Sequence, residues 1–84
     1  SQSMQVYVIT QHQRYEGSIM LKISSSLDKS LQHLREIVTS GNRHPDLWLE
    51  ENLEIYANYK NTVCLYRDAE RSDTHYSIRI HPVD

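Results

Sequence analysis

One apolar stripe constrains this chain more than any other feature. Leu27, Leu31, Leu34 and Val38 recur at steps of four, three and four residues, which is the spacing of one face of an α-helix. Ile37 widens the stripe, and most of the residues between these positions are polar or charged. Because no other segment has a comparable helical pattern, we expect the remaining apolar residues to pack around this one helix.

The sequence also marks both ends of the helix, which we expect within Ser25–Gly41. Three serines, Ser24–Ser26, precede the stripe, and a serine oxygen accepts a hydrogen bond from an unpaired N–H of the first turn. Ser25 with Asp28 three positions later is related to the capping box. Gly41 and Asn42 follow the last apolar residue, and both tolerate the left-handed conformation that closes helices.

Segments that are rich in β-branched and aromatic residues, or that alternate apolar with polar residues, predict strands. The predicted strands are Gln5–Thr10, Ser18–Ser24, the alternating stretch from Leu53 to Lys60, Thr62–Arg67 and His75–Val83. Pro82 is expected to end the last strand because proline lacks the N–H that a strand donates. Leu47–Asn52 fits either a helical turn or a short strand.

The order strand-strand-helix-strand-strand-strand indicates an α+β fold, with a four- or five-stranded sheet packed on the amphipathic helix. A helix between the second and third strands allows one parallel pairing, so we expect a mixed sheet. Phenylalanine is absent, so the core should be mainly aliphatic. The expected buried residues are Val6, Val8, Ile19, Leu21, Ile23, Leu27, Leu31, Leu34, Val38, Leu53, Ile55, Val63, Leu65, Ile78 and Ile80.

The length of 84 residues suits one domain, which we place at residues 4–84, with Ser1–Ser3 interpreted as an expression scar. A single cysteine, Cys64, permits no internal disulfide and favours a reducing compartment, the cytoplasm or nucleus. The net charge of −2 gives no broad attraction to nucleic acid or anionic lipid. No apolar run approaches the roughly 20 residues that span a bilayer.

The first half of the chain resembles the ubiquitin-like β-grasp family. Met4–Val8 opens the chain as a strand, and a hairpin, a second alternating strand and a serine-capped helix follow, so that the resemblance covers Met4–Gly41. A conjugated modifier of that family ends in Gly-Gly, whereas this chain ends in His81-Pro82-Val83-Asp84. The resemblance therefore implies a non-conjugated interaction domain.

Histidines are the first candidates for chemistry. Their positions are His12, His33, His44, His75 and His81. None of them has the spacing of a zinc protease or a zinc finger, so we expect solvated histidines and predict no metal and no cofactor. His12 is expected to approach His75 or His81 if the terminal strands are neighbours.

Two other candidates for catalysis have simple structural explanations. Cys64 lies between Val63 and Leu65 in a predicted strand, where a cysteine usually behaves as a small apolar residue. The acidic residues Glu50, Glu51 and Glu54 form a local run, but a domain with one helix has little room for a cleft that would hold a paired acid and base. We therefore predict that the chain is not an enzyme.

Arginines and tyrosines near the C-terminus are the best candidates for binding nucleic acid. Arg67, Arg71 and Arg79 alternate with Tyr66 and Tyr76, and stacked tyrosines beside arginines are typical of single-strand binding. Acidic residues interrupt this patch, and the net charge is negative. Nucleic-acid binding is therefore an alternative to the main prediction.

The main prediction concerns side chains that point away from the helix. If Val6 and Val8 face the helix, Tyr7 and Ile9 face the opposite side. The same argument places Met20, Tyr56, Cys64 and Tyr66 on that side. Tyrosine and methionine are enriched at protein interfaces. The predicted interface consists of Tyr7, Ile9, Met20, Trp48, Tyr56 and Tyr66. In the alternative, Leu47–Leu49 folds back and covers this face.

The sequence thus predicts a non-catalytic protein-interaction module. It would bind another protein, or a second copy as a homodimer, through a tyrosine-rich sheet face or an exposed sheet edge. The alternatives are a nucleic-acid-associated regulatory protein that uses Arg67, Arg71 and Arg79 with Tyr66 and Tyr76, and a small inhibitor or immunity protein. Nucleic acid and membrane are not the expected partners.

Overall fold

Strands and helices follow one another in the order that the sequence predicts. The computed structural model describes residues 4–40 and 47–83. Its elements are β1 (Met4–Gln13), β2 (Gly17–Ser24), α1 (Leu27–Val38), the short 3-10 helix η2 (Glu50–Asn52), β3 (Leu53–Tyr59), β4 (Thr62–Arg67) and β5 (Thr74–Val83). In this described part, no helix is long and apolar enough to cross a membrane.

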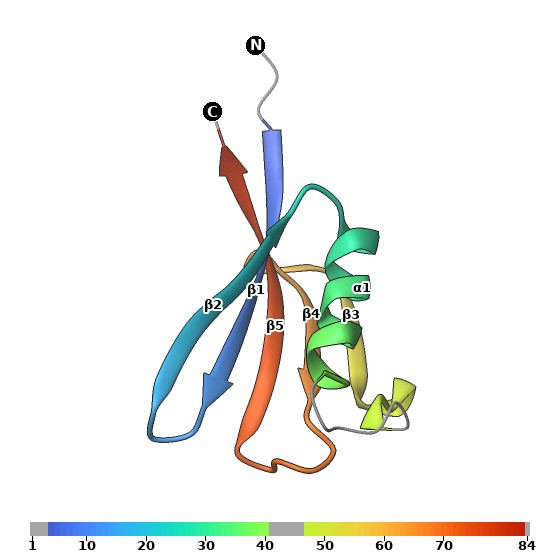
Figure 1. Ribbon diagram of the computed structural model, residues 1–84. Helices are drawn as coiled ribbons and strands as arrows, with labels where there is room; N and C mark the ends of the chain where they lie inside the picture. The colour runs from blue at the N-terminus through green and yellow to red at the C-terminus, as the bar shows by residue number, and fades with distance from the viewer. Residues whose placement is uncertain (1–3, 41–46, 84) are drawn as a thin grey trace.

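The strands form one five-stranded sheet in the order β2-β1-β5-β4-β3, with α1 against one face (Figure 1). All four neighbouring pairs are antiparallel, so the prediction of a mixed sheet is wrong. The helix does join two strands that run in the same direction, β2 and β3. These strands lie at opposite edges with three strands between them, and therefore no parallel pair forms.

The predicted helix is confirmed, with a different serine at its start. The Ser26 side chain accepts a hydrogen bond from the Lys29 N–H at 3.2 Å, so Ser26 and not Ser25 is the N-cap. Leu34 and Val38 are fully buried against the sheet, while Leu27 and Leu31 are half-buried. The helix ends at Val38. The predicted closing residues Gly41 and Asn42 lie outside the described residues.

Strand register reverses the face that was predicted to contact the helix. Ile9 is opposite Ile78 on the next strand, and both are fully buried in the core beneath α1. Tyr7 also packs against this core, whereas Val8 lies on the opposite face. The first strand is apolar at four successive positions, Val6–Ile9, so its pattern does not specify which alternate set points inward.

Several residues that were expected to be buried are exposed. Ile19, Leu21 and Ile23 on β2 retain 55%, 36% and 52% of their surface, and Ile55 on β3 retains 54%. The physical reason is the position of their strands, because β2 and β3 are the two edges of the sheet and α1 does not cover their outer sides. Ile23 also lies on the face away from α1, opposite Val8. The core is built instead on β1, β4 and β5.

Beyond the rest of the sheet, β1 and β5 continue as a two-stranded arm (Figure 1). Pro82 lies within this arm opposite Gln5, so the prediction that Pro82 ends the strand is wrong by one residue. The Ile80 N–H is directed toward the start of β4, where it donates at 2.8 Å to the carbonyl of Asn61, the residue just before that strand. Pro82 is two residues after Ile80, so its nitrogen points in the same direction. At that position β5 has already passed the end of β4, and therefore the missing N–H of Pro82 has no β4 carbonyl to bond.

Candidate functional site

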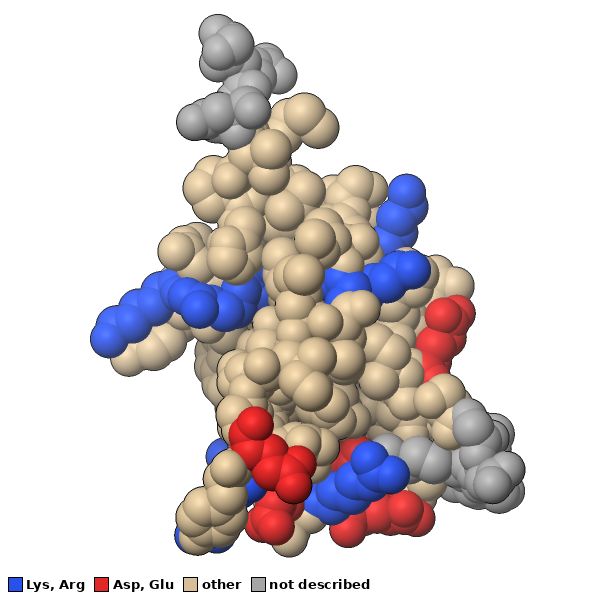
Figure 2. Space-filling model, turned by 60° about the vertical axis from the view of Figure 1, so that its left-hand side comes forward, with Lys and Arg blue, Asp and Glu red and all other residues tan. Residues whose placement is uncertain are grey.

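Edge strand β2 carries the largest run of exposed apolar side chains in the described residues. All its residues except Ser24 are exposed. Ile19, Met20, Leu21 and Ile23 retain 55%, 60%, 36% and 52% of their surface. Figure 2 brings the β2 side forward, and most charged side chains lie toward the sides and the lower end of this view. We name these four residues the β2 edge.

The β2 edge is apolar on both faces of the sheet. The register pairs Ile23 with Val8 and Met20 with Thr10, which places Ile23 and Met20 on the face away from α1. Ile19 is opposite Gln11, on the helix side. A register shift falls between these pairs, and Leu21 is the extra residue. A partner that covers the β2 edge must therefore contact both sides of the sheet.

A shallow groove of about 370 Å³ separates β2 from α1. Its walls are formed by Leu21, Lys22, His33, Glu36, Ile37 and Ser40. Glu36 lies 3.6 Å from the Nδ1 atom of His33, and Lys22 is the one charged residue of β2. The helix side of the β2 edge thus combines apolar surface with one cation and one anion.

A histidine pair lies on the face of the sheet away from α1. His12 and His75 are directly opposite each other on β1 and β5, and their rings stack with centroids 4.7 Å apart. The prediction that His12 approaches His75 is confirmed. The ring nitrogens of His12 lie 2.7 Å from Ser18 Oγ and 2.9 Å from Ser77 Oγ. Burial lowers the pKa of His12, and the positive charges of His75 and Arg79 lower it further.

This pair does not extend to a metal centre in the part of the chain that the structure describes. No group of three His, Cys, Asp or Glu side chains there has the geometry to hold a metal ion. His44 lies outside the described residues. Cys64 is fully buried, and burial raises the pKa of its thiol to about 12, so its nucleophilic thiolate form is scarce near neutral pH.

Four of the six predicted interface residues belong to the core or its border. Ile9 and Tyr66 are completely buried, Trp48 is 9% exposed, and Tyr7 packs against the same cluster. The prediction that Tyr7, Ile9 and Tyr66 point away from the helix is therefore wrong, because the register places them on the helix side. The buried Cys64 lies on that side too. Met20 and Tyr56 are the two that stay outside this core cluster.

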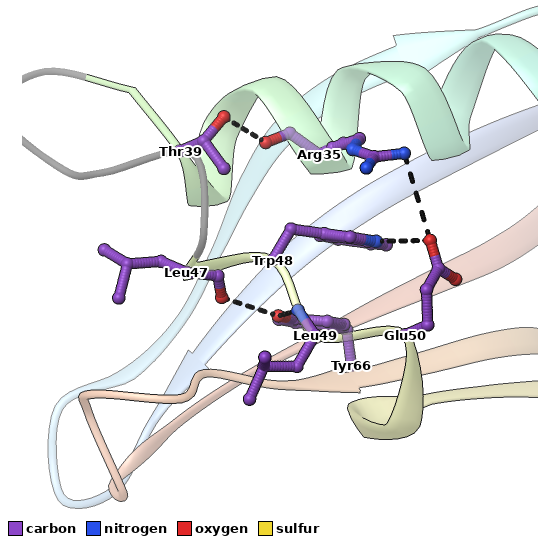
Figure 3. A network of polar contacts seen from close by, with 7 residues as sticks. All are labelled: Arg35, Thr39, Leu47, Trp48, Leu49, Glu50 and Tyr66. Atoms are coloured by element: carbon purple, nitrogen blue, oxygen red, sulfur yellow. Dashed lines mark hydrogen bonds and ion pairs between the residues drawn. The ribbon is translucent and has the colours of Figure 1, made fainter.

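Trp48 covers Tyr66 on the helix side of the sheet, so the alternative in which Leu47–Leu49 covers the face away from the helix is wrong as well. Their rings stack 4.3 Å apart, and the Trp48 indole N–H donates to Glu50 Oε1 at 2.8 Å (Figure 3). The Tyr66 hydroxyl donates to the Leu47 carbonyl and accepts from the Leu49 N–H. Arg35 on α1 lies over the Trp48 ring. Leu47–Asn52 is thus an irregular segment that ends in η2 and closes one end of the core.

The predicted nucleic-acid residues do not combine exposed tyrosines with arginines, because both tyrosines are buried. Tyr66 and Tyr76 are 0% and 2% exposed, so neither ring is available to stack on a base. Arg67 is opposite His75, and Arg79 lies four positions further along β5. Arg71 lies in the loop between β4 and β5. The three arginines could still contact phosphates, but the two tyrosines that were expected to stack on bases are buried.

Comparisons with known proteins give no relative. No protein-family model, no curated protein and no solved structure matches this chain. The ubiquitin-like resemblance therefore stays a prediction.

Proposed function

We propose that this chain is a protein-interaction module that binds a protein partner along the β2 edge. One observation carries the proposal, namely that an edge strand exposes four large apolar residues, Ile19, Met20, Leu21 and Ile23, on both faces of the sheet. An exposed contiguous apolar patch on a small domain usually marks an interaction site. An edge strand also offers unpaired backbone groups to a further strand.

The energy available from this surface is substantial. Complete burial of one aliphatic side chain contributes about 1.5–3 kcal/mol. The four residues of the β2 edge are only partly exposed, but they are adjacent and are buried together by one partner. Association also costs translational and rotational freedom, which such a patch must offset. The β2 edge therefore suits a partner that contacts all four residues.

The opposite edge of the sheet is a weaker candidate. On β3, Ile55 and Tyr59 are 54% and 64% exposed, but Lys60 lies over the Tyr59 ring and the polar Asn58 stands between the two residues in the strand. An inhibitor or immunity protein would be a narrower form of the same proposal, because it also acts by binding a protein.

Capture from native lysate tests the β2 edge. We expect an Ile23→Lys variant to lose partners that the wild-type chain retains, because a charge in the buried part of an interface must be desolvated. Ile55→Lys on β3 is the matched control, since Ile55 and Ile23 are 54% and 52% exposed. Partners that bind Ile23→Lys as well as the wild type, but are lost with Ile55→Lys, would contradict the proposal and favour the β3 edge.

A further inference from the structure

We propose that the partner of the β2 edge is a second copy of this chain, which adds its own β2 antiparallel to the first across a two-fold axis. This inference rests on the proposed function and names the partner. The resulting dimer has one continuous ten-stranded sheet with both α1 helices on the same side. The proposal follows from the faces, the register and the charges of β2.

Apolar surface on both faces of one edge strand favours another sheet edge as the occupant. Met20 and Ile23 point away from α1, whereas Ile19 and Leu21 lie on the helix side. A globular partner that docks on one face of the sheet would cover only one of these two pairs of residues and leave the pair on the other face exposed. A strand that continues the sheet contacts both pairs at once, because its own side chains alternate between the two faces.

Self-pairing is possible in a register that respects these faces. Residues directly opposite each other in an antiparallel pair point to the same face. If the axis passes between Leu21 and Lys22, Met20 lies opposite Ile23 of the second copy, and both point away from the helices. Leu21 then lies opposite Lys22 of the second copy, and both line the helix side. The contact is isologous, because each copy supplies the same residues in exchange.

Charges on this surface are also self-complementary. Lys22 is the one charged residue of β2, and Glu36 stands on the α1 wall of the same groove. Across the axis, Lys22 of one copy lies opposite Leu21 of the other copy. Leu21 lines the groove that also contains Glu36, so each Lys22 approaches the Glu36 of the other copy. Each glutamate therefore offsets the repulsion between the two lysines near the axis.

The oligomeric state tests the proposal first. In sedimentation equilibrium from about 1 µM to about 1 mM, we expect the wild type to form a dimer that dissociates on dilution. Ile23→Lys should weaken the dimer at least about 30-fold, the effect of losing a central contact. Ile55→Lys on the other edge should leave it unchanged. Met20→Lys serves as a second disrupting variant, and circular dichroism verifies that each variant is folded.

Cross-linking then tests the register. A mixture of Met20→Cys and Ile23→Cys proteins should form a disulfide between copies, because directly opposite residues are close enough for one. A mixture of Ile19→Cys and Ile23→Cys should not, since these residues point to opposite faces. The native Cys64 is buried and does not compete.

The failures of the two proposals are distinguishable. A wild-type chain that stays monomeric up to about 1 mM overturns the self-pairing, and the proposed function survives if lysate capture still depends on Ile23. A dimer that both lysine substitutions leave intact overturns the self-pairing, and unchanged lysate capture in the same variants overturns the proposed function as well. A cross-link through Ile19 in place of Met20 overturns the register.

Discussion

Tyr66 is held at both ends of its side chain. Its ring lies between Trp48 and Tyr76, with centroids 4.3 Å and 6.4 Å away, and its hydroxyl contacts the backbone of Leu47 and Leu49. A tyrosine can be completely buried when its hydroxyl has partners, and here those partners are 17 and 19 residues away in the sequence. Alternation along β4 does not reveal such distant partners, and the pattern therefore predicts that Tyr66 faces away from the helix.

His12 makes stability depend on pH. Its pKa in the folded chain is below the ordinary value of 6.5, so near and below pH 6.5 the unfolded chain binds more protons than the folded chain. The free energy of unfolding should therefore fall as the pH falls through 6.5 toward the lowered pKa. Urea unfolding at about pH 7.5 and about pH 5.5 measures this difference.

A His12→Asn variant should show a smaller loss between these two pH values than the wild type. The exposed His81 provides a matched control, since His81→Asn should retain the wild-type difference. An equal pH dependence in His12→Asn and the wild type would show that other groups cause it.

At the scale of the element, the N-cap of α1 and its interior each hold a serine, and the two have opposite effects. Ser26 caps the first turn through its hydroxyl. Ser30 is completely buried, and its hydroxyl has no hydrogen-bond partner among the described residues. A buried hydroxyl without a partner costs free energy, and serine is also a poorer helix former than alanine. The same substitution should therefore have opposite signs at the two positions.

We expect Ser26→Ala to lower the free energy of unfolding by about 1 kcal/mol. Ser30→Ala should raise it by about 1 kcal/mol, because it removes a desolvated hydroxyl and adds a better helix former. Urea denaturation of both variants beside the wild type measures the two values. A loss of stability in Ser30→Ala would mean that its hydroxyl has a bonding role.

Elements differed in how much of their structure the sequence could specify. The helix was predictable because its apolar spacing and a capping serine agreed. The strands were predictable as strands, but Val6–Ile9 is apolar throughout and fits the core with either face inward. Strand order was not encoded in any one segment, so nothing marked Ile19 and Ile23 as edge residues. Their exposure, the main feature of the candidate site, followed from that order and, for Ile23, from the register that places it on the face away from α1.

At the scale of the whole molecule, self-association would make stability depend on concentration. The folded dimer is favoured by mass action, so the melting temperature of the wild type should rise with protein concentration. Ile23→Lys should show a smaller rise in melting temperature over the same concentrations, since its dimer is weakened at least about 30-fold. Differential scanning calorimetry over a 100-fold dilution series measures both, and a concentration-independent wild type would contradict self-pairing.

The arm formed by β1 and β5 has a practical consequence. Met4 and Val83 are opposite each other, so both ends of the described chain leave the molecule side by side (Figure 1). Adjacent ends permit a folded unit to be spliced into a surface turn of an unrelated host without being stretched. Residues 4–83 could therefore be displayed as a guest whose two junctions lie together on the arm.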